Sequence, residues 1–116
     1  MSTTTSLEVK IERTPAAIII RLKGEASVQN VDELERQLRP IAASAAGLVV
    51  VDLSGLSFIS SLGLGLMVQF DRGIARKGGR VRFAAAQPLV RGVITKSRLD
   101  AVLQMCASVQ DALAAR

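Results

Sequence analysis

Apolar and charged residues alternate in two neighbouring segments near the start of the chain, 7–12 (LEVKIE) and 18–22 (IIIRL). A period of two is typical of a strand with one buried face. Thr14-Pro15 lies between the segments and is a turn signal, and Lys23-Gly24 follows the second one. The pattern therefore predicts a β-hairpin at the start of the chain.

The next periodic segment, 31–45, has the spacing of a helix. Its apolar residues recur three and four positions apart, which places them on one helix face. Asn30 precedes the segment as a candidate N-cap, and Asp32 and Glu33 place negative charge in the first turn, where the helix dipole favours it. The apolar positions are Val31, Leu34, Leu38, Ile41 and Ala45.

A continuous apolar run, LVVVDL at 48–53, comes after the first predicted helix. Such a run is typical of a strand covered on both faces and therefore of a parallel sheet. We expect SGLSFIS (54–60) to be a connection, 62–74 to form a second helix and RVRFAAA (80–86) to form another strand. A strand, helix, strand unit of this kind is parallel and right-handed.

The last third of the chain predicts two more helices and a short strand. Gln87-Pro88 leads into a third helix, and 101–105 (AVLQM) is a short apolar strand. Ser108 and Asp111 have the spacing of a capping box that opens a last helix, which we expect to end at Ala115. The chain thus predicts an α/β fold, a small mixed sheet of about five strands with about four helices packed on it. We expect residues 1–6 to be a disordered tail and residues 7–116 to be a single domain.

Charge is distributed unevenly along the chain. Residues 1–70 carry six basic and seven acidic side chains, whereas residues 71–116 carry nine basic and three acidic ones. A basic half can attract nucleic acid, an anionic membrane or an acidic protein. The basic residues are spread over several predicted elements, and the chain has no Trp or Tyr on which bases could stack. We therefore favour a solvated basic face, and we predict no direct contact with nucleic acid.

Membrane and secretory signals are weak. The longest mostly apolar run, 41–53, contains Ser44 and Asp52 and is too short to span a bilayer. The N-terminus lacks a basic region followed by an apolar block, and one cysteine, Cys106, cannot form an intramolecular disulfide. These features predict no membrane insertion and a cytoplasmic location.

The residue inventory argues against catalysis. The chain has no histidine, which removes His-based acid–base chemistry, Ser-His triads and His-ligated metal sites. Cys106 is read as a small buried residue rather than a nucleophile. Asp52 ends a central strand without a second acid nearby, so we expect it to hold the following turn through its backbone. A nucleotide-binding glycine fingerprint would need a third glycine where Val68 stands. We predict no enzymatic activity, no cofactor and no metal.

The segment FISSLGLG at 58–65 sets two hydroxyls and two glycines into an apolar run. Ser61 lies where a strand gives way to a helix, and its hydroxyl is placed to cap the first turn. Gly63 and Gly65 would each cost about 1 kcal/mol relative to alanine inside a helix, so we expect close approach by a packed strand or by a partner protein. Leu62 and Leu64 would present apolar surface beside them.

A phosphate on Ser61 would suit this position. Unpaired N–H groups and the helix dipole stabilise an anion at a helix N-terminus. The same phosphate would add about two negative charges to a surface of Ser, Gly and Leu, and would disrupt a partner that docks there by packing. The segment therefore predicts a docking surface that phosphorylation can switch.

The stretch VVVDLSGLSFISSLGLGLM (49–67) resembles the signature region of the STAS domain family, the bacterial anti-sigma factor antagonists. The resemblance spans nearly the whole chain. It includes the KGE turn at 23–25, the helix start at Asn30, the GGRV strand start at 78–81 and the RLD loop at 98–100.

The resemblance implies a function in transcription regulation. A short protein of this family binds an anti-sigma factor that is also a serine kinase, frees the sigma factor, and is inactivated by phosphorylation of a serine that Ser61 matches. A phosphatase is a candidate second partner. The partner-binding residues that the resemblance implies are Ser27, Asn30, Ser60, Leu62, Gly63 and Leu64.

Three positions depart from the family pattern. The family usually has an aspartate before the phosphoacceptor and a second hydroxyl after it, where this chain has Ser60 and Leu62, and Ser27 replaces a frequent aspartate. Two interpretations stay open, a phosphorylation switch and constitutive binding. STAS-like subunits also accompany membrane transporters, including lipid-transport ABC complexes, and such a subunit is the alternative function.

Overall fold

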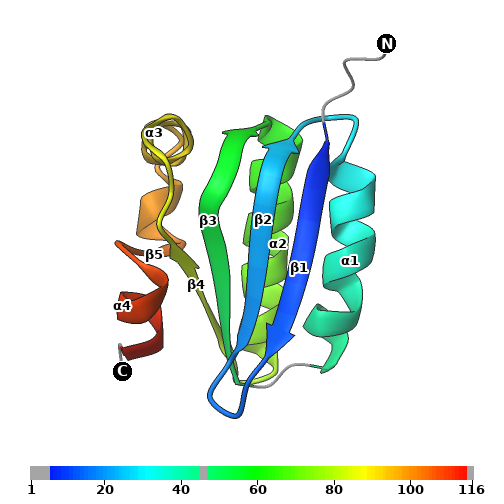
Figure 1. The fold of residues 1–116 in the computed structure, drawn as a ribbon, viewed down its shortest axis with the longest axis vertical. Coiled ribbons are helices and arrows are strands. Elements are labelled where there is room, and N and C mark those ends of the chain that lie inside the picture. The colour runs from blue at the N-terminus through cyan, green and yellow to red at the C-terminus, as the bar shows by residue number, and fades with distance from the viewer. Residues whose placement is uncertain (1–5, 45–46, 115–116) are drawn as a thin grey trace.

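The computed structural model describes residues 6–44 and 47–114, which form one five-stranded sheet with helices packed on it (Figure 1). This confirms the predicted α/β fold with a small mixed sheet. The elements in chain order are β1 (Leu7–Arg13), β2 (Ile18–Ala26), α1 (Val31–Ser44), β3 (Leu48–Ile59), α2 (Ser61–Arg76), β4 (Arg80–Ala84), α3 (Pro88–Lys96), the 3-10 turn η1 (Leu99–Ala101), β5 (Gln104–Cys106) and α4 (Val109–Ala114).

The strands lie in the sheet in chain order, β1-β2-β3-β4-β5. β1 and β2 are antiparallel and form the predicted hairpin, whose turn is held by Thr14: its Oγ1 accepts a hydrogen bond from the N–H of Ala17 at 3.0 Å. The pairs β2–β3, β3–β4 and β4–β5 are all parallel. The predicted parallel strand, helix, strand unit is therefore confirmed for β3, α2 and β4.

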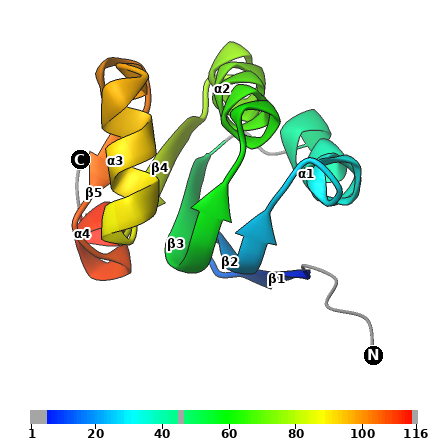
Figure 2. The ribbon, with the colours of Figure 1, turned by 90° about the horizontal axis from the view of Figure 1, so that it is seen from above.

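Helices cover both faces of the sheet to different extents. α1, α2 and α3 lie side by side on one face, whereas α4 covers only part of the other (Figure 2). The main core fills the space between the sheet and α1, α2 and α3. A smaller cluster joins Ala112 of α4 to Ile19, Val50 and Ala84 of the sheet. The helical residues of the main core are Leu34, Leu38, Ile41, Leu64, Met67, Phe70, Ile74, Val90 and Ile94.

The third strand is buried on both faces over its first half, as its continuous apolar run predicts. Val49, Val51 and Leu53 face the main core, and Val50 faces the α4 side. The expectation that 54–60 is a connection is wrong, because β3 continues to Ile59. Its second half pairs with the end of β2 through two register shifts. Such irregular pairing accommodates serine and glycine residues, which on their own favour a loop.

A β-bulge in β3 explains the conformation after Asp52. Asp52 pairs with Arg21 while Gly55 pairs with Lys23, so two residues of β3 oppose one residue of β2. The Asp52 carboxylate accepts hydrogen bonds from the N–H of Ser54 at 2.9 Å and from Arg21 at 2.8 Å. The predicted backbone contact of Asp52 is confirmed, although it holds a bulge within a strand rather than a turn.

Arg21 also pairs with Glu12 of β1 at 2.6 Å, so one guanidinium links β1, β2 and β3. Two hydrogen bonds raise the pKa of Arg21 above its ordinary value. The bond to Glu12 has the larger effect and the bond to Asp52 the smaller one. The side chain therefore stays charged, and the three-strand link persists at every pH at which both carboxylates are ionised.

Asp52→Ala is expected to lower the free energy of unfolding by about 2 kcal/mol, because it leaves the Ser54 N–H of the bulge without its partner and removes a buried carboxylate. Chemical denaturation checks this value. Glu12→Ala is the matched control, since it removes the other partner of Arg21 from an exposed position and should cost less than about 1 kcal/mol. Equal losses for the two variants would contradict the role assigned to Asp52.

The two ends of the chain differ from the sequence-based expectations. β5 spans Gln104–Cys106 rather than 101–105, because η1 and a turn occupy the preceding residues. Ser108 caps α4 as predicted, with its Oγ accepting a hydrogen bond from the N–H of Asp111 at 3.0 Å. Ser6 was expected in the disordered tail, but its carbonyl accepts a hydrogen bond from the N–H of Glu25 at 3.0 Å. Residues 1–5, Ala45 and Ala115 lie outside the described residues.

Among the described residues, the basic side chains of the second half are exposed except that of Arg82, which is not part of a solvated face. It is buried in β4 and donates a hydrogen bond to the carbonyl of Ala112 at 2.8 Å, which ties the sheet to α4. Cys106 is half-buried beside the same small cluster. Among the helices of the described residues, none has both the length and the apolarity needed to cross a bilayer.

Candidate functional site

The candidate site lies around the start of α2, directly after the end of β3. Ser60, not Ser61, is the N-cap: its Oγ accepts a hydrogen bond from the N–H of Gly63 at 3.1 Å. The expectation that Ser61 caps this helix is therefore wrong by one residue. Serine and aspartate cap helices about equally well, so Ser60 performs the capping that an aspartate would perform, without its charge.

The two serines at this junction have different environments. Ser60 is 8% exposed, and its hydroxyl is committed to the cap. Ser61 is the first residue of α2 and is exposed. The first N–H groups of a helix have no partner within it, so an anion on the Ser61 hydroxyl would lie at the positive end of the dipole. Of the two hydroxyls, that of Ser61 is the one that another protein can reach.

Gly63 and Gly65 serve different purposes. A Cβ on Gly63 would lie 3.0 Å from the side chain of Ile59 and 3.3 Å from the carbonyl of Ala26, so this glycine permits close packing of α2 on the ends of β2 and β3. The expected close approach of a neighbouring strand is thus confirmed for Gly63. At Gly65, no heavy atom of the described residues outside the local helix backbone lies within 4 Å of the Cβ position.

The two leucines also differ. Leu62 is 55% exposed, as expected for apolar surface at the helix start. Leu64 is 6% exposed and packs in the main core, so the expectation that it presents apolar surface is wrong. The difference follows from helix geometry, because residues two positions apart lie on opposite sides of the helix.

The loop before α1 supplies the remaining predicted residues. Ser27 is buried, which leaves little of it for a partner to contact. Asn30 directly precedes α1, as predicted, and its side-chain amide donates a hydrogen bond to the carbonyl of Glu25 at 2.8 Å. This bond fastens the start of α1 to the end of β2, next to the start of α2, because the Ser60 N–H donates to the carbonyl of Ala26 at 2.8 Å. The structure therefore gathers Asn30, Ser61 and Leu62 at one end of the parallel strands.

A groove runs between α1 and α2 from this end of the sheet. Its upper part is a hollow of about 310 Å³ that includes Ser61, Leu62 and Gly65 of α2 and Val31 and Asp32 of α1. A second hollow of about 160 Å³ continues it. The two share Glu35, Leu66 and Gln69. We call the two hollows together the α1–α2 groove.

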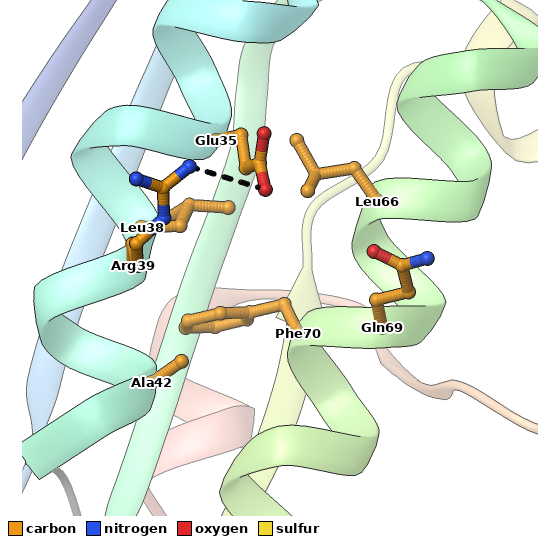
Figure 3. Close-up of a pocket in the computed structure, with 7 residues that line it drawn as sticks. All are labelled: Glu35, Leu38, Arg39, Ala42, Leu66, Gln69 and Phe70. Atoms are coloured by element: carbon orange, nitrogen blue, oxygen red, sulfur yellow. Dashed lines mark ion pairs between the residues drawn. The ribbon is translucent and has the colours of Figure 1, made fainter.

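The lower part of the groove is apolar at its base. The ring of Phe70 lies between the two helices, near Leu38 and Ala42 (Figure 3). Glu35 and Arg39 form an ion pair at 3.4 Å along the α1 side (Figure 3). This groove was not predicted from the sequence. The helical spacing of Leu62, Gly65, Leu66 and Gln69 marks the α2 wall, but only the packing of α1 against α2 creates the hollow.

The side chains at this site are suited to binding another protein. Within residues 6–44 and 47–114, no group of three or more His, Cys, Asp or Glu side chains is placed to hold a metal ion. The groove offers apolar side chains, one open glycine, carboxylates on its α1 wall and a reachable hydroxyl at its upper end. Such surfaces suit a protein partner.

Comparison with known proteins places the chain. A family model described as the STAS domain matches residues 8–112. The chain belongs to the STAS domain family. This confirms the resemblance carried by the segment at 49–67.

This STAS domain has relatives of known name. An anti-sigma F factor antagonist of Paenibacillus polymyxa is 26% identical over 99 residues, which cover 84% of this chain and 85% of that protein. The crystal structure of an anti-sigma factor antagonist from Mycobacterium paratuberculosis has a TM-score of 0.87 at 24% identity and covers 95% of this chain and 93% of that one.

The antagonist SpoIIAA matches in two forms. Its unphosphorylated form has a TM-score of 0.75 at 27% identity, with 91% of this STAS domain and 93% of that chain covered. Its phosphorylated form, described as a Bacillus cell fate determinant, has a TM-score of 0.70 at 25% identity, with 91% and 96% covered.

Proposed function

We propose that this STAS domain is an anti-sigma factor antagonist that binds its partner at the start of α2. The observation that carries the proposal is the exposure of Ser61 and Leu62 side by side at the end of a helix that Ser60 and Gly63 hold in place. A rigid support lets exposed side chains bind without a large loss of conformational entropy. The names of the relatives support the same partner class.

We further propose that the partner is an anti-sigma factor with serine kinase activity, and that Ser61 is the phosphoacceptor. Ser61 is exposed, whereas the neighbouring hydroxyl of Ser60 is buried in the cap. SpoIIAA, a relative of this domain, exists in phosphorylated and unphosphorylated forms, which supports a switch of this kind. A phosphatase would return this domain to its binding form.

Phosphorylation would act on the complex rather than on the fold. A phosphate on the first residue of α2 is favoured by the helix dipole, so the helix should stay intact. The same dianion would stand next to Leu62, and a partner that packs on Leu62 would have to strip water from it. The unmodified form binds, and the phosphorylated form is released.

The domain acts by binding rather than by turnover in this proposal, and it acts in the cytoplasm, where sigma factors control transcription. The alternative of a transporter subunit predicts a different partner. Copurification with a transport ATPase from detergent-solubilised membranes, in place of an anti-sigma factor, would support that alternative.

The proposal is tested by incubating purified domain with ATP and each kinase-type anti-sigma factor encoded by the same organism. We expect one phosphate per chain on Ser61 in peptide mass spectrometry and none on Ser61→Ala. Ser57→Ala is the matched control, since Ser57 is an exposed serine of β3 outside α2 and its loss should leave phosphorylation unchanged. Phosphate on another serine, or on none, would contradict the proposed switch.

A further inference from the structure

Beyond the contact at Ser61, we infer that the α1–α2 groove receives an amphipathic helix of the anti-sigma factor, with its backbone lying against Gly65 and a basic side chain facing the α1 wall. The inference rests on the proposed function and extends it from one helix end to a defined groove. It names the shape and the charge of the partner segment.

Gly65 leaves space on the α2 wall of the groove. It is the fifth residue of α2, where glycine is less favourable than alanine, and no described part of the fold comes close enough to require it. Gly63 differs, because a Cβ there would make tight contacts with the side chain of Ile59 and the carbonyl of Ala26. A glycine that the fold itself does not need, on the wall of a groove, permits close approach by a backbone from another molecule.

The shape of the groove favours a helix as the occupant. The groove follows α2 from Ser61 to Phe70, about 14 Å at the rise of an α-helix, which matches two to three turns of a second helix. The residues that line it all belong to α1 and α2, so an extended peptide would find no strand edge among them to pair with. Leu62 at the top is exposed, and Leu66, which lines both hollows, is half-buried; these two leucines suit apolar side chains at helical spacing on the partner.

The acidic side chains on the α1 wall favour a basic residue on the partner helix. The protein carries a net charge of +5, yet the upper groove is lined on α1 by the carboxylate of Asp32 and by Glu35, which already pairs with Arg39. Its α2 wall has Gln69 as the polar residue at the same level. A Lys or Arg on the partner helix would complement this wall, and it would lie opposite the α2 side on which Ser61 stands.

The test measures affinity by calorimetric titration with the purified kinase-type anti-sigma factor that the wild-type domain binds. Gly65→Ala should weaken binding about tenfold or more, because a methyl group is forced into a close contact. The same substitution should raise the melting temperature by about 4 °C through helix propensity. Gly92→Ala is the matched control: Gly92 is the fifth residue of α3, also without a described neighbour near its Cβ position. It should raise the melting temperature and leave affinity unchanged.

Two further variants test whether a basic residue of the partner binds the α1 wall. Asp32→Asn should weaken binding about threefold and reduce its salt dependence. Glu33→Gln should change neither, because Glu33 lies outside the groove and is bonded to Arg36 and Gln37.

The outcomes separate the groove from the proposed function. Normal affinity of Gly65→Ala, together with loss of binding by Leu62→Asp, would overturn the groove while leaving the docking surface at Ser61 intact. Equal losses for Gly65→Ala and Gly92→Ala would also overturn the groove. If the wild-type domain binds none of the anti-sigma factors of its organism, the proposed function itself is overturned, and the groove assignment with it.

Discussion

Leu62→Asp is expected to weaken binding to the anti-sigma factor by about 2 to 3 kcal/mol, roughly 30- to 150-fold, with no loss of stability. Leu62 is more than half exposed at the second position of α2, so the fold loses little packing. An aspartate there is favoured by the helix dipole. The partner, in contrast, would lose an apolar contact and would face a charge that it must desolvate. Calorimetric titration gives the affinity and thermal unfolding gives the stability.

Leu89→Asp is the control for this variant. Leu89 is the second residue of α3 and is 59% exposed, so the substitution is matched in residue type, helix position and exposure. α3 lies on the far side of α2 from α1 (Figure 2), away from the groove. Leu89→Asp should bind as the wild type does. A comparable loss of affinity in both variants would show that the effect is general surface charge rather than docking at α2.

Phe83→Ala is expected to lower the free energy of unfolding by about 3 to 5 kcal/mol, a large share of the 5 to 15 kcal/mol typical of whole domains. Phe83 lies in β4 and is fully buried between the sheet and its helices. Removal of the ring leaves a cavity that the surrounding strands can fill only in part. Urea denaturation should show a lower midpoint.

Phe58→Ala provides the comparison at the same residue type. Phe58 is 41% exposed near the end of β3 and should cost less than about 1 kcal/mol. Similar losses for the two phenylalanines would contradict the placement of Phe83 in the packed main core and of Phe58 at an exposed position near the end of β3.

Much of the fold could be predicted because its signals are local. Alternating apolar and charged residues predict the hairpin, and apolar residues at helical spacing predict α1 and α2. The continuous apolar run at 48–53 predicts the central strand. The extension of β3 to Ile59 could not be seen this way. Serines and a glycine favour loops by their local preferences, whereas pairing with β2 across two bulges is a tertiary effect that overrides them.

The candidate site was predictable in part. The sequence marks the start of α2, and therefore the exposed Ser61 and Leu62. The assignment of the cap to Ser61 was wrong by one residue, since a serine at either position can accept a hydrogen bond from the first turn. The burial of Leu64 and the different surroundings of the two glycines depend on which face of α2 meets the sheet, and the groove depends on two helices that are distant in sequence.

We propose that the start of α2 binds an anti-sigma factor and that a phosphate on Ser61 ends the binding. To test this, the purified kinase-type anti-sigma factor is titrated, in the absence of ATP, into unmodified domain and into domain phosphorylated on Ser61 alone. We predict a measurable complex for the unmodified domain and affinity at least about a hundredfold weaker for the phosphorylated one, equivalent to about 2.7 kcal/mol. Equal affinities for the two forms would show that phosphorylation of Ser61 does not control binding.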